Sequence, residues 1–258
     1  MPAFRLLFVR VLPAMLLLAT TASAADWGTL KGRFVIGGDV AAPAALTVDK
    51  DVEVCGKHNL VNEEVVVGDD KGIANVVVFV RDKKVTVKPE LEAAAKEAKP
   101  VLDNLNCRFE PHVLFVQTGQ ELVVNNSDPV GHNSNISTVK NPPSNNLIPA
   151  GGEVTTTFSS DEAVPSQVTC NIHPWMKGWI VVRDNPYAAV SSLDGSFEIA
   201  DLPAEELQLQ FWHEKAGYIG EMTIDGKKEK ARRGRMKLEI KPGDNDLGEI
   251  VLDAGLFQ

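Results

Sequence analysis

Residues 170–182 read CNIHPWMKGWIVV, and this stretch decides the fold of the chain. Cys170, His173 and Met176 place a thiol, an imidazole and a thioether at intervals of three residues. They occupy a loop that leads into the apolar run 179–182, whose composition predicts a β-strand. Soft sulfur ligands beside imidazole favour copper. The stretch therefore predicts a metal-binding loop next to a strand, with a further histidine ligand supplied by another part of the chain.

A series of short motifs upstream supplies that histidine. The series ends in an Asn-x-Asp pattern that is followed by His132. It resembles the pattern of the cupredoxin (plastocyanin- and amicyanin-like blue copper) family, in which the same short Cys-to-Met spacing occurs. The resemblance covers residues 109–182. Its upstream motifs are Phe109-x-Pro111, Leu114-x-Val116, Gly119, Leu122-x-Val124, Asn126-x-Asp128 and His132-Asn133.

The resemblance implies a type-1 copper site that binds one ion, as Cu(I) or Cu(II). The backbone N–H of Asn133 would donate to the Cys170 sulfur and tune the reduction potential. Zinc could use the same thiolate and imidazoles, but a thioether is a poor zinc ligand. A structural turn without metal is the other alternative. The implied copper ligands are His132, Cys170, His173 and Met176.

Four residues near the motif bear on how such a site would work. Ser134 and Val168 stand where the family has an apolar and an aromatic residue, which affects the expected potential rather than the ligands. In the family the loop histidine lies near the surface. Pro174 and Trp175 are therefore expected to form part of an apolar docking rim for a protein redox partner. Inward packing is the alternative for Trp175.

The other histidines carry less information. His58, His112 and His213 have no ligand spacing around them and are interpreted as ordinary surface or strand residues. His112 follows the Phe-x-Pro motif, so a place as a second polar neighbour of the metal is its alternative.

The cysteine count agrees with an exported protein. The chain has three cysteines, and in an oxidising compartment two of them are expected to pair. Because Cys170 belongs to the metal motif, we predict a disulfide between Cys55 and Cys107. Two unpaired buried thiols are the alternative.

The N-terminus has the pattern of a secretory signal peptide. Arg5 and Arg10 precede an apolar run at 11–19, and small residues follow at 21–25. The apolar run is short for a membrane span, which leaves an uncleaved anchor as the alternative. We predict a signal peptide at residues 1–24, no transmembrane segment in the mature chain, and a location in the periplasm or outside the cell.

The composition describes a folded, acidic protein. Hydrophobic residues make up 44% of the chain, enough for a substantial core in one or two domains. The net charge of -9 argues against nucleic acid as a partner. No nucleophile elbow or zincin helix is present, so no hydrolase is predicted. A basic cluster at 227–237 is interpreted as a solvated connection between strands, with a docking patch for an acidic partner as the alternative.

Most of the chain has the alternating pattern and turn signals of short strands, and a helix is expected only near residues 90–99. We therefore predict an all-β protein: a cupredoxin Greek-key β-sandwich plus a second, smaller β-sandwich module. The expected boundaries are 26–184 for the cupredoxin-like domain, with its core at 101–183, and 185–258 for the second module.

The second module rests on a resemblance of its own. The pattern Asp194-Gly195-x-Phe197-x-Ile199-x-x-Leu202-Pro203 resembles carboxypeptidase-regulatory-like (transthyretin-like) β-sandwich modules. Residues 74–80 are expected to form the first cupredoxin strand. The alternative is that they complete the second module, which would make the cupredoxin an insertion.

Two functions fit these features. The first is a carrier of single electrons between redox partners, and it is not an enzyme. The alternative is a copper-handling or structural copper-binding module. Delivery proteins commonly expose many Met or His ligands, and this chain has only five of each, so ligand type favours the electron carrier.

Overall fold

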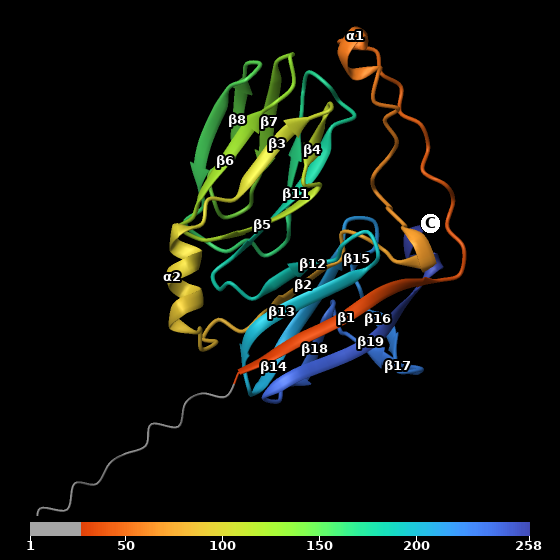
Figure 1. Ribbon diagram of the computed structural model, residues 1–258, viewed down its shortest axis with the longest axis vertical. Coiled ribbons are helices and arrows are strands. Elements are labelled where there is room, and N and C mark those ends of the chain that lie inside the picture. The colour runs from red at the N-terminus through yellow and green to blue at the C-terminus, as the bar shows by residue number, and fades with distance from the viewer. Residues whose placement is uncertain (1–26) are drawn as a thin grey trace, which may run out of the picture.

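Two β-sandwiches make up the protein in the computed structural model, which describes residues 27–258 (Figure 1). The predicted signal peptide at residues 1–24 lies outside the described residues. We call the two units the upper and the lower sandwich, after their places in Figure 1. Many of their strands alternate between buried and more exposed side chains, as a period of two predicts. The predicted all-β fold class is confirmed.

The upper sandwich contains the predicted metal-binding loop. Its strands are β3 (Val101–Leu105), β4 (Arg108–Glu110), β5 (Val113–Gln117), β6 (Glu121–Asn126), β7 (His132–Ser137), β8 (Ser144–Ile148), β9 (Glu153–Thr157), β10 (Ser166–Thr169) and β11 (Lys177–Arg183). Their orders in the two sheets are β5-β11-β10-β7-β8 and β4-β3-β6-β9. Apolar side chains from both sheets, among them Phe109, Val116 and Ile180, form one buried core. Burial of this apolar surface holds the sheets together.

The lower sandwich is built from both ends of the described chain. Its strands are β1 (Trp27–Gly37), β2 (Val77–Val80), β12 (Ala188–Val190), β13 (Ser196–Pro203), β14 (Glu206–His213), β15 (Gly217–Tyr218), β16 (Glu221–Ile224), β17 (Lys227–Lys230), β18 (Arg235–Glu239) and β19 (Gly243–Asp253). One sheet has the order β13-β1-β19-β16-β17, and the other has the order β12-β2-β14-β15, with β18 paired to β14. In its core the Phe34 ring stacks on Phe197 with centroids 5.0 Å apart.

The pairing of β1 and β2 corrects the predicted domain boundary. Residues 74–80 were expected to begin the cupredoxin sandwich, but β2 lies between β12 and β14 of the lower sandwich. Likewise β1 lies between β13 and β19. The upper sandwich is thus an insertion in the lower one, and with ten strands against nine in residues 27–258 the lower sandwich is not the smaller. Alternation predicts a strand but not its partner, because pairing depends on contacts far apart in sequence.

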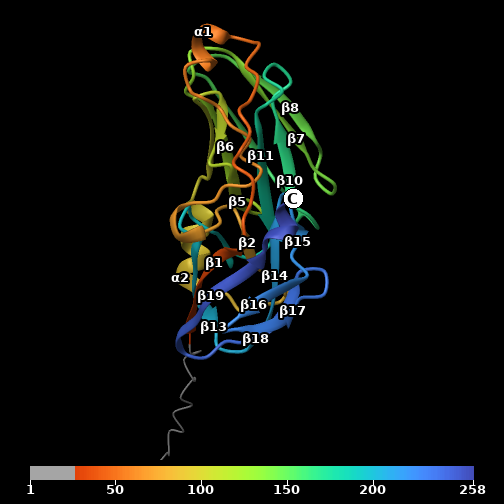
Figure 2. The ribbon, with the colours of Figure 1, turned by 90° about the vertical axis from the view of Figure 1, so that its right-hand side faces the viewer.

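A long irregular connection leaves β1, runs along the upper sandwich and returns to β2 (Figures 1 and 2). It carries the short helix α1 (Val52–Cys55) at the far end of the upper sandwich and the 3-10 turn η1 (Asp69–Lys71). The predicted disulfide is present, since Cys55 is bonded to Cys107 just before β4. This bond ties the connection to the upper sandwich. We call residues 38–62 of the connection the covering segment.

The two sandwiches share a buried apolar junction. Val77 and Phe79 of β2 belong to one cluster with Val113 and Val181 of the upper sandwich and Trp212 of β14. The junction therefore packs β2 and β14 of the lower sandwich against β5 and β11 of the inserted unit.

The helix α2 (Pro89–Glu97) lies beside the two sandwiches (Figure 1) and matches the helix expected near 90–99. Proline suits its first turn, and Glu92 forms an i,i+4 ion pair with Lys96 at 3.1 Å. Among the described residues, no helix has the length and apolar character that crossing a membrane requires.

Candidate metal centre

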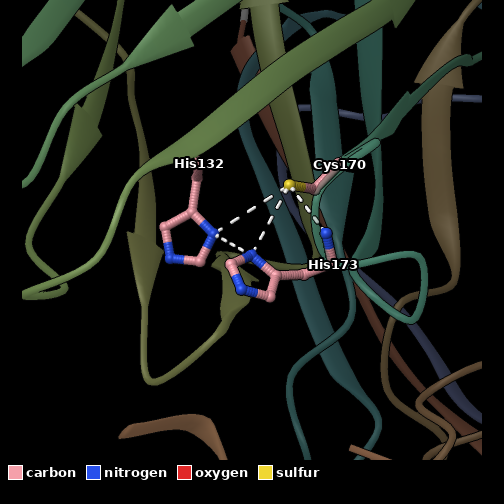
Figure 3. Close-up of side chains that lie close together, drawn as sticks. All are labelled: His132, Cys170 and His173. Carbon is pink, nitrogen blue, oxygen red and sulfur yellow. Dashed lines mark hydrogen bonds between the residues drawn. The ribbon is translucent and has the colours of Figure 1, made fainter. Parts of the chain in front are cut away.

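Three buried side chains direct one donor atom each at the same point (Figure 3). The Nδ1 atoms of His132 and His173 lie 2.9 Å apart, and the Sγ atom of Cys170 lies 4.0 Å and 3.8 Å from them. A triangle with these edges has a circumradius of about 2.1 Å, within the range of metal bonds to imidazole nitrogen and thiolate sulfur. The donor set therefore fits one metal ion held by two imidazoles and a thiolate.

Backbone hydrogen bonds shape the loop that carries two of these donors. Cys170 follows the end of β10, and its N–H donates to the Met176 carbonyl at 3.3 Å. The Met176 N–H donates to the His173 carbonyl at 2.9 Å. These bonds close a turn before β11, and Met176 lies in the same buried apolar cluster as Cys170. The three-residue spacing of the sequence thus becomes a tight turn with three buried side chains.

The strand β7 brings the remaining histidine to this loop. His132 is its first residue, and β7 pairs antiparallel with β10, with Asn135 opposite Thr169. Because β10 ends beside the loop, this register places His132 next to Cys170 although 38 residues separate them.

A carboxylate holds the outer nitrogen of each imidazole. The Nε2 atom of His132 lies 2.9 Å from Asp128 Oδ2, and the Nε2 atom of His173 lies 2.8 Å from Asp51 Oδ2. Donation from each Nε2–H to its carboxylate assigns the tautomer and leaves both Nδ1 atoms free to bind a metal. Carboxylate–histidine pairs of this kind also raise the basicity of the ligand nitrogen.

Asp128 is itself fixed by the chain next to the disulfide. Its two carboxylate oxygens accept from the backbone N–H groups of Asn106, at 2.7 Å, and Cys107, at 2.8 Å. Cys107, Asp128 and His132 also place candidate ligand atoms within 4.8 Å of one another. Since the sulfur of Cys107 is in a disulfide and Asp128 is engaged by these bonds, this second group does not fit a metal site.

Asn133 links the two ligand segments through its side chain. Its Oδ1 atom accepts from the N–H of Asn171 at 2.8 Å and of Ile172 at 3.3 Å. Its Nδ2 donates to Asn145 at 2.6 Å. The sequence drew attention only to the backbone N–H of Asn133, whereas its amide side chain anchors the loop to β7.

The electrostatics of the site favour a thiolate at Cys170. Burial alone would raise the pKa of this thiol, but hydrogen bonds from His132 and from the backbone N–H groups of Asn133, His173 and Ile172 lower it below its ordinary value.

The two histidines are shifted in opposite directions. Burial opposes a charge on His132, but its bonds to Asp128 and Cys170 outweigh that cost and raise its pKa to about 9. Burial lowers the pKa of His173, and repulsion from His132 adds to this, against the effect of Asp51. In the metal-free protein near neutral pH, His132 therefore carries a hydrogen on Nδ1 as well as on Nε2. An incoming ion must displace the Nδ1 hydrogen.

The covering segment closes the His173 edge of the site. His173 is 0% exposed, whereas the family resemblance implied a ligand near the surface. Its ring lies 5.1 Å from that of Trp175, whose indole N–H donates to the Cys107 carbonyl at 3.2 Å. Trp175 is half-buried and Pro174 is exposed. Of the two residues expected at a docking rim, Pro174 thus lies at the surface and Trp175 packs partly inward.

Sequence reasoning did not find Asp51. It lies 122 residues from His173, directly before α1, in a segment without a strand or helix pattern of its own. Asp128, by contrast, belongs to the Asn-x-Asp motif that leads to His132.

The other described residues singled out from the sequence do not belong to the donor cluster of His132, Cys170 and His173. His112 contacts Glu214 at the junction of the sandwiches, His213 is buried against Phe257, and His58 follows α1. The basic cluster at 227–237 spans β17 and the start of β18 and is mostly exposed, as a solvated connection would be.

Similarity to solved structures is partial. A copper-containing nitrite reductase from Thermus scotoductus SA-01 is 21% identical, with a TM-score of 0.31; the match covers 42% of this chain and 25% of that one. A purple cupredoxin from Nitrosopumilus maritimus is 20% identical over 33% of this chain and 99% of its own, with a TM-score of 0.28. A Cu(I) form of an amicyanin variant is 17% identical over 41% and 98%, with a TM-score of 0.30.

This chain therefore spans only a quarter of the nitrite reductase. No protein-family model matches the sequence, and no curated protein matches it either.

Proposed function

We propose that this chain is an exported type-1 copper protein that carries single electrons between redox partners. The observation that carries the proposal is the convergence of two imidazole Nδ1 atoms and one thiol on a point about 2.1 Å from each, the length of a metal bond. The proposed ligands are His132, Cys170 and His173, with Met176 as a distant axial ligand.

Copper bound there would supply reversible one-electron chemistry. The chain itself would keep the ligands in one arrangement, because Asp128 and Asp51 fix the two rings and Asn133 fixes the loop. Ligands that move little between oxidation states keep the reorganisation cost low. His132, Cys170, His173 and Met176 are each at most 2% exposed, so the site excludes water.

Other features support parts of this proposal. The Cys55–Cys107 disulfide suits an oxidising compartment, in agreement with the signal peptide proposed at residues 1–24 and a periplasmic or extracellular location. We assign copper binding to residues 101–183. For the lower sandwich we propose a structural role, as its resemblance to transthyretin-like modules implies.

The test is a visible spectrum of the full-length protein titrated with Cu(II). We expect an intense thiolate-to-copper charge-transfer band with one equivalent, lost in Cys170→Ser but kept in Ser134→Ala, a change beside the site that removes no ligand. A colourless copper complex would overturn the type-1 assignment. A reduction potential and a self-exchange rate then separate the electron carrier from a copper-handling module, which would exchange electrons slowly but release copper to a chelator.

A further inference from the structure

A cavity of about 320 Å³ lies against the candidate metal centre. It is bounded by the covering segment and residues that follow it, by the loop between β10 and β11, and by Glu214 after β14. Its volume is near the lower end of the range for sites that bind small organic molecules, about 300–1,000 Å³. Met176 and Trp175 form the wall on the side of the metal centre.

One end of the cavity holds a polar group without a partner. His112 is 10% exposed, and its Nε2 is paired with Glu214. Its Nδ1 is buried and makes no hydrogen bond, and lies 3.9 Å from the Glu63 Oε2 atom. A carboxylate lies at each ring nitrogen, Glu214 at Nε2 and Glu63 at Nδ1, and this arrangement favours the imidazolium form, in which both nitrogens are donors. Burial opposes a charge on His112, but the contact with Glu214 outweighs it and raises the pKa. The cavity thus offers a donor and an acceptor side by side.

This pair selects the chemistry of the group that fits between them. An oxygen about 2.8 Å from both atoms can span a gap of 3.9 Å. It must accept from His112 and donate to Glu63, which a hydroxyl does and a carboxylate or an ammonium does not. Glu63, Glu64 and Glu214 line the cavity together with Arg108 and Lys177, and the Oε1 atom of Glu63 is paired with Arg108 at 2.9 Å, which leaves its Oε2 atom for a ligand.

The rest of the wall suits a flat apolar body. The indoles of Trp175 and Trp179 line the cavity together with Leu60 and Met176. Both indole N–H groups are already used, by the Cys107 carbonyl and by Glu214. What these tryptophans add to the cavity is therefore aromatic surface, which packs well against another ring.

The cavity also reaches the candidate metal centre, through Met176 and Trp175. Asp51 and the disulfide close the His173 edge. Met176 is both a proposed ligand and a wall of the cavity, and the Trp175 ring lies 5.1 Å from that of His173.

We propose that this cavity binds a small phenol or hydroquinone that donates one electron to the copper ion. This inference rests on the proposed electron-carrier function and identifies the class of molecule that would donate the electron. The ring would lie among Trp175, Trp179 and Leu60, with its hydroxyl between His112 and Glu63. In the step, the O–H bond breaks, the proton passes to the Glu63 carboxylate, one electron reduces Cu(II) to Cu(I), and the aryloxyl radical leaves.

Binding is tested first, on the full chain with and without copper. Phenol is titrated while the indole N–H signals of Trp175 and Trp179 are followed by NMR. We expect saturable shifts in both states, an affinity at least about fivefold weaker in Glu63→Gln, and no change in Glu249→Gln. Glu249 is a matched control because it pairs with Arg33 at 2.8 Å as Glu63 pairs with Arg108 at 2.9 Å, but lies in the lower sandwich. Shifts that do not saturate, or equal affinities in all three proteins, would overturn the site.

The electron step is tested by stopped-flow reduction of the Cu(II) protein. With hydroquinone, the rate should saturate and fall at least about tenfold in Glu63→Gln, because the proton acceptor is lost. With hexaammineruthenium(II), which has no hydroxyl, Glu63→Gln should match the unmutated protein within about twofold. A linear dependence on hydroquinone, or equal losses with both reductants, would refute the donor role. If no charge-transfer band forms, the proposed function fails, and the phenol titration without copper still decides whether the cavity is a ligand site.

Discussion

The Nε2 atom of His173 lies 2.8 Å from the Oδ2 atom of Asp51, although 122 residues separate them. Asp51 adopts a left-handed conformation (φ 46°, ψ 43°) directly before α1, and the disulfide at Cys55 holds this turn against the upper sandwich. A histidine that the family resemblance places near the surface is therefore closed off by a distant segment. We therefore expect the Asp51 carboxylate to affect the reduction potential of a copper ion bound at this site.

Asp51→Asn should raise the Cu(II)/Cu(I) reduction potential. The carboxylate favours the more positive oxidation state and makes His173 a stronger donor, so its removal favours Cu(I). The Asp51 side chain is 43% exposed, and solvent screens part of its charge. We expect a shift on the order of tens of millivolts, measured by spectroelectrochemical titration.

Asp49→Asn is the matched control for this measurement. Asp49 is an exposed carboxylate two residues away in the same covering segment. Equal shifts in both variants would mean that only the overall charge of the segment matters and that the contact with His173 does not.

The residues of the candidate metal centre could be singled out from the sequence in part because their signals are local. The loop from Cys170 to Met176 and the motif that ends in His132 are continuous patterns whose spacing limits the possible geometry. Asp51 has no such pattern, since an acidic residue in an irregular segment resembles any solvated one. The same reason explains β2: its apolar run identified a strand, but nothing in residues 74–80 distinguishes the edge of one sandwich from the middle of the other.

Removing the disulfide should destabilise the protein and loosen the covering segment. In the chain-entropy description, a bond between cysteines 52 positions apart stabilises the folded state by about 4 kcal/mol. We expect a loss near this value in guanidinium unfolding of the double variant Cys55→Ser, Cys107→Ser. Both cysteines are replaced so that no free thiol competes with Cys170. An unfolding free energy within about 1 kcal/mol of the unmutated protein would contradict this expectation.

His213 should make stability fall in mild acid. Burial, with a smaller repulsion from His112, lowers its pKa to about 4 from the ordinary value of 6.5. Between these two values the unfolded chain binds a proton that the folded protein does not, so stability is complete above pH 6.5 and declines as the pH falls toward 4. The contribution lost is about 3 kcal/mol.

Urea unfolding of copper-free protein at pH 7.5, 5.5 and 4.5 measures this effect, with His213→Gln as the variant that cannot titrate. The stability advantage of the unmutated protein over His213→Gln should shrink as the pH falls. A difference between the two proteins that does not change with pH would show that burial does not suppress the protonation of His213.

Trp175 offers a test of whether packing or docking explains its position. Its indole N–H donates to the Cys107 carbonyl, and its ring contacts the buried clusters around both the metal centre and the disulfide. Because the side chain is only half-buried, Trp175→Ala should lower the unfolding free energy by about 2–3 kcal/mol, less than for a fully buried tryptophan. Trp175→Phe keeps an aromatic ring and loses one hydrogen bond, so it should cost about 1 kcal/mol.

Electron self-exchange of the copper-loaded variants completes the comparison. If Trp175 also forms part of the transfer surface with Pro174, Trp175→Ala should slow exchange per folded molecule, whereas Trp175→Phe should stay close to the unmutated rate because a ring still covers His173. The charge-transfer band should keep its position in both variants, since neither change removes a ligand. Pro174→Ala alters the neighbouring exposed residue without touching the buried clusters, and it should change the exchange rate with little effect on stability. A stability loss in Trp175→Ala with an unchanged exchange rate would assign this tryptophan to packing alone and remove it from the docking surface.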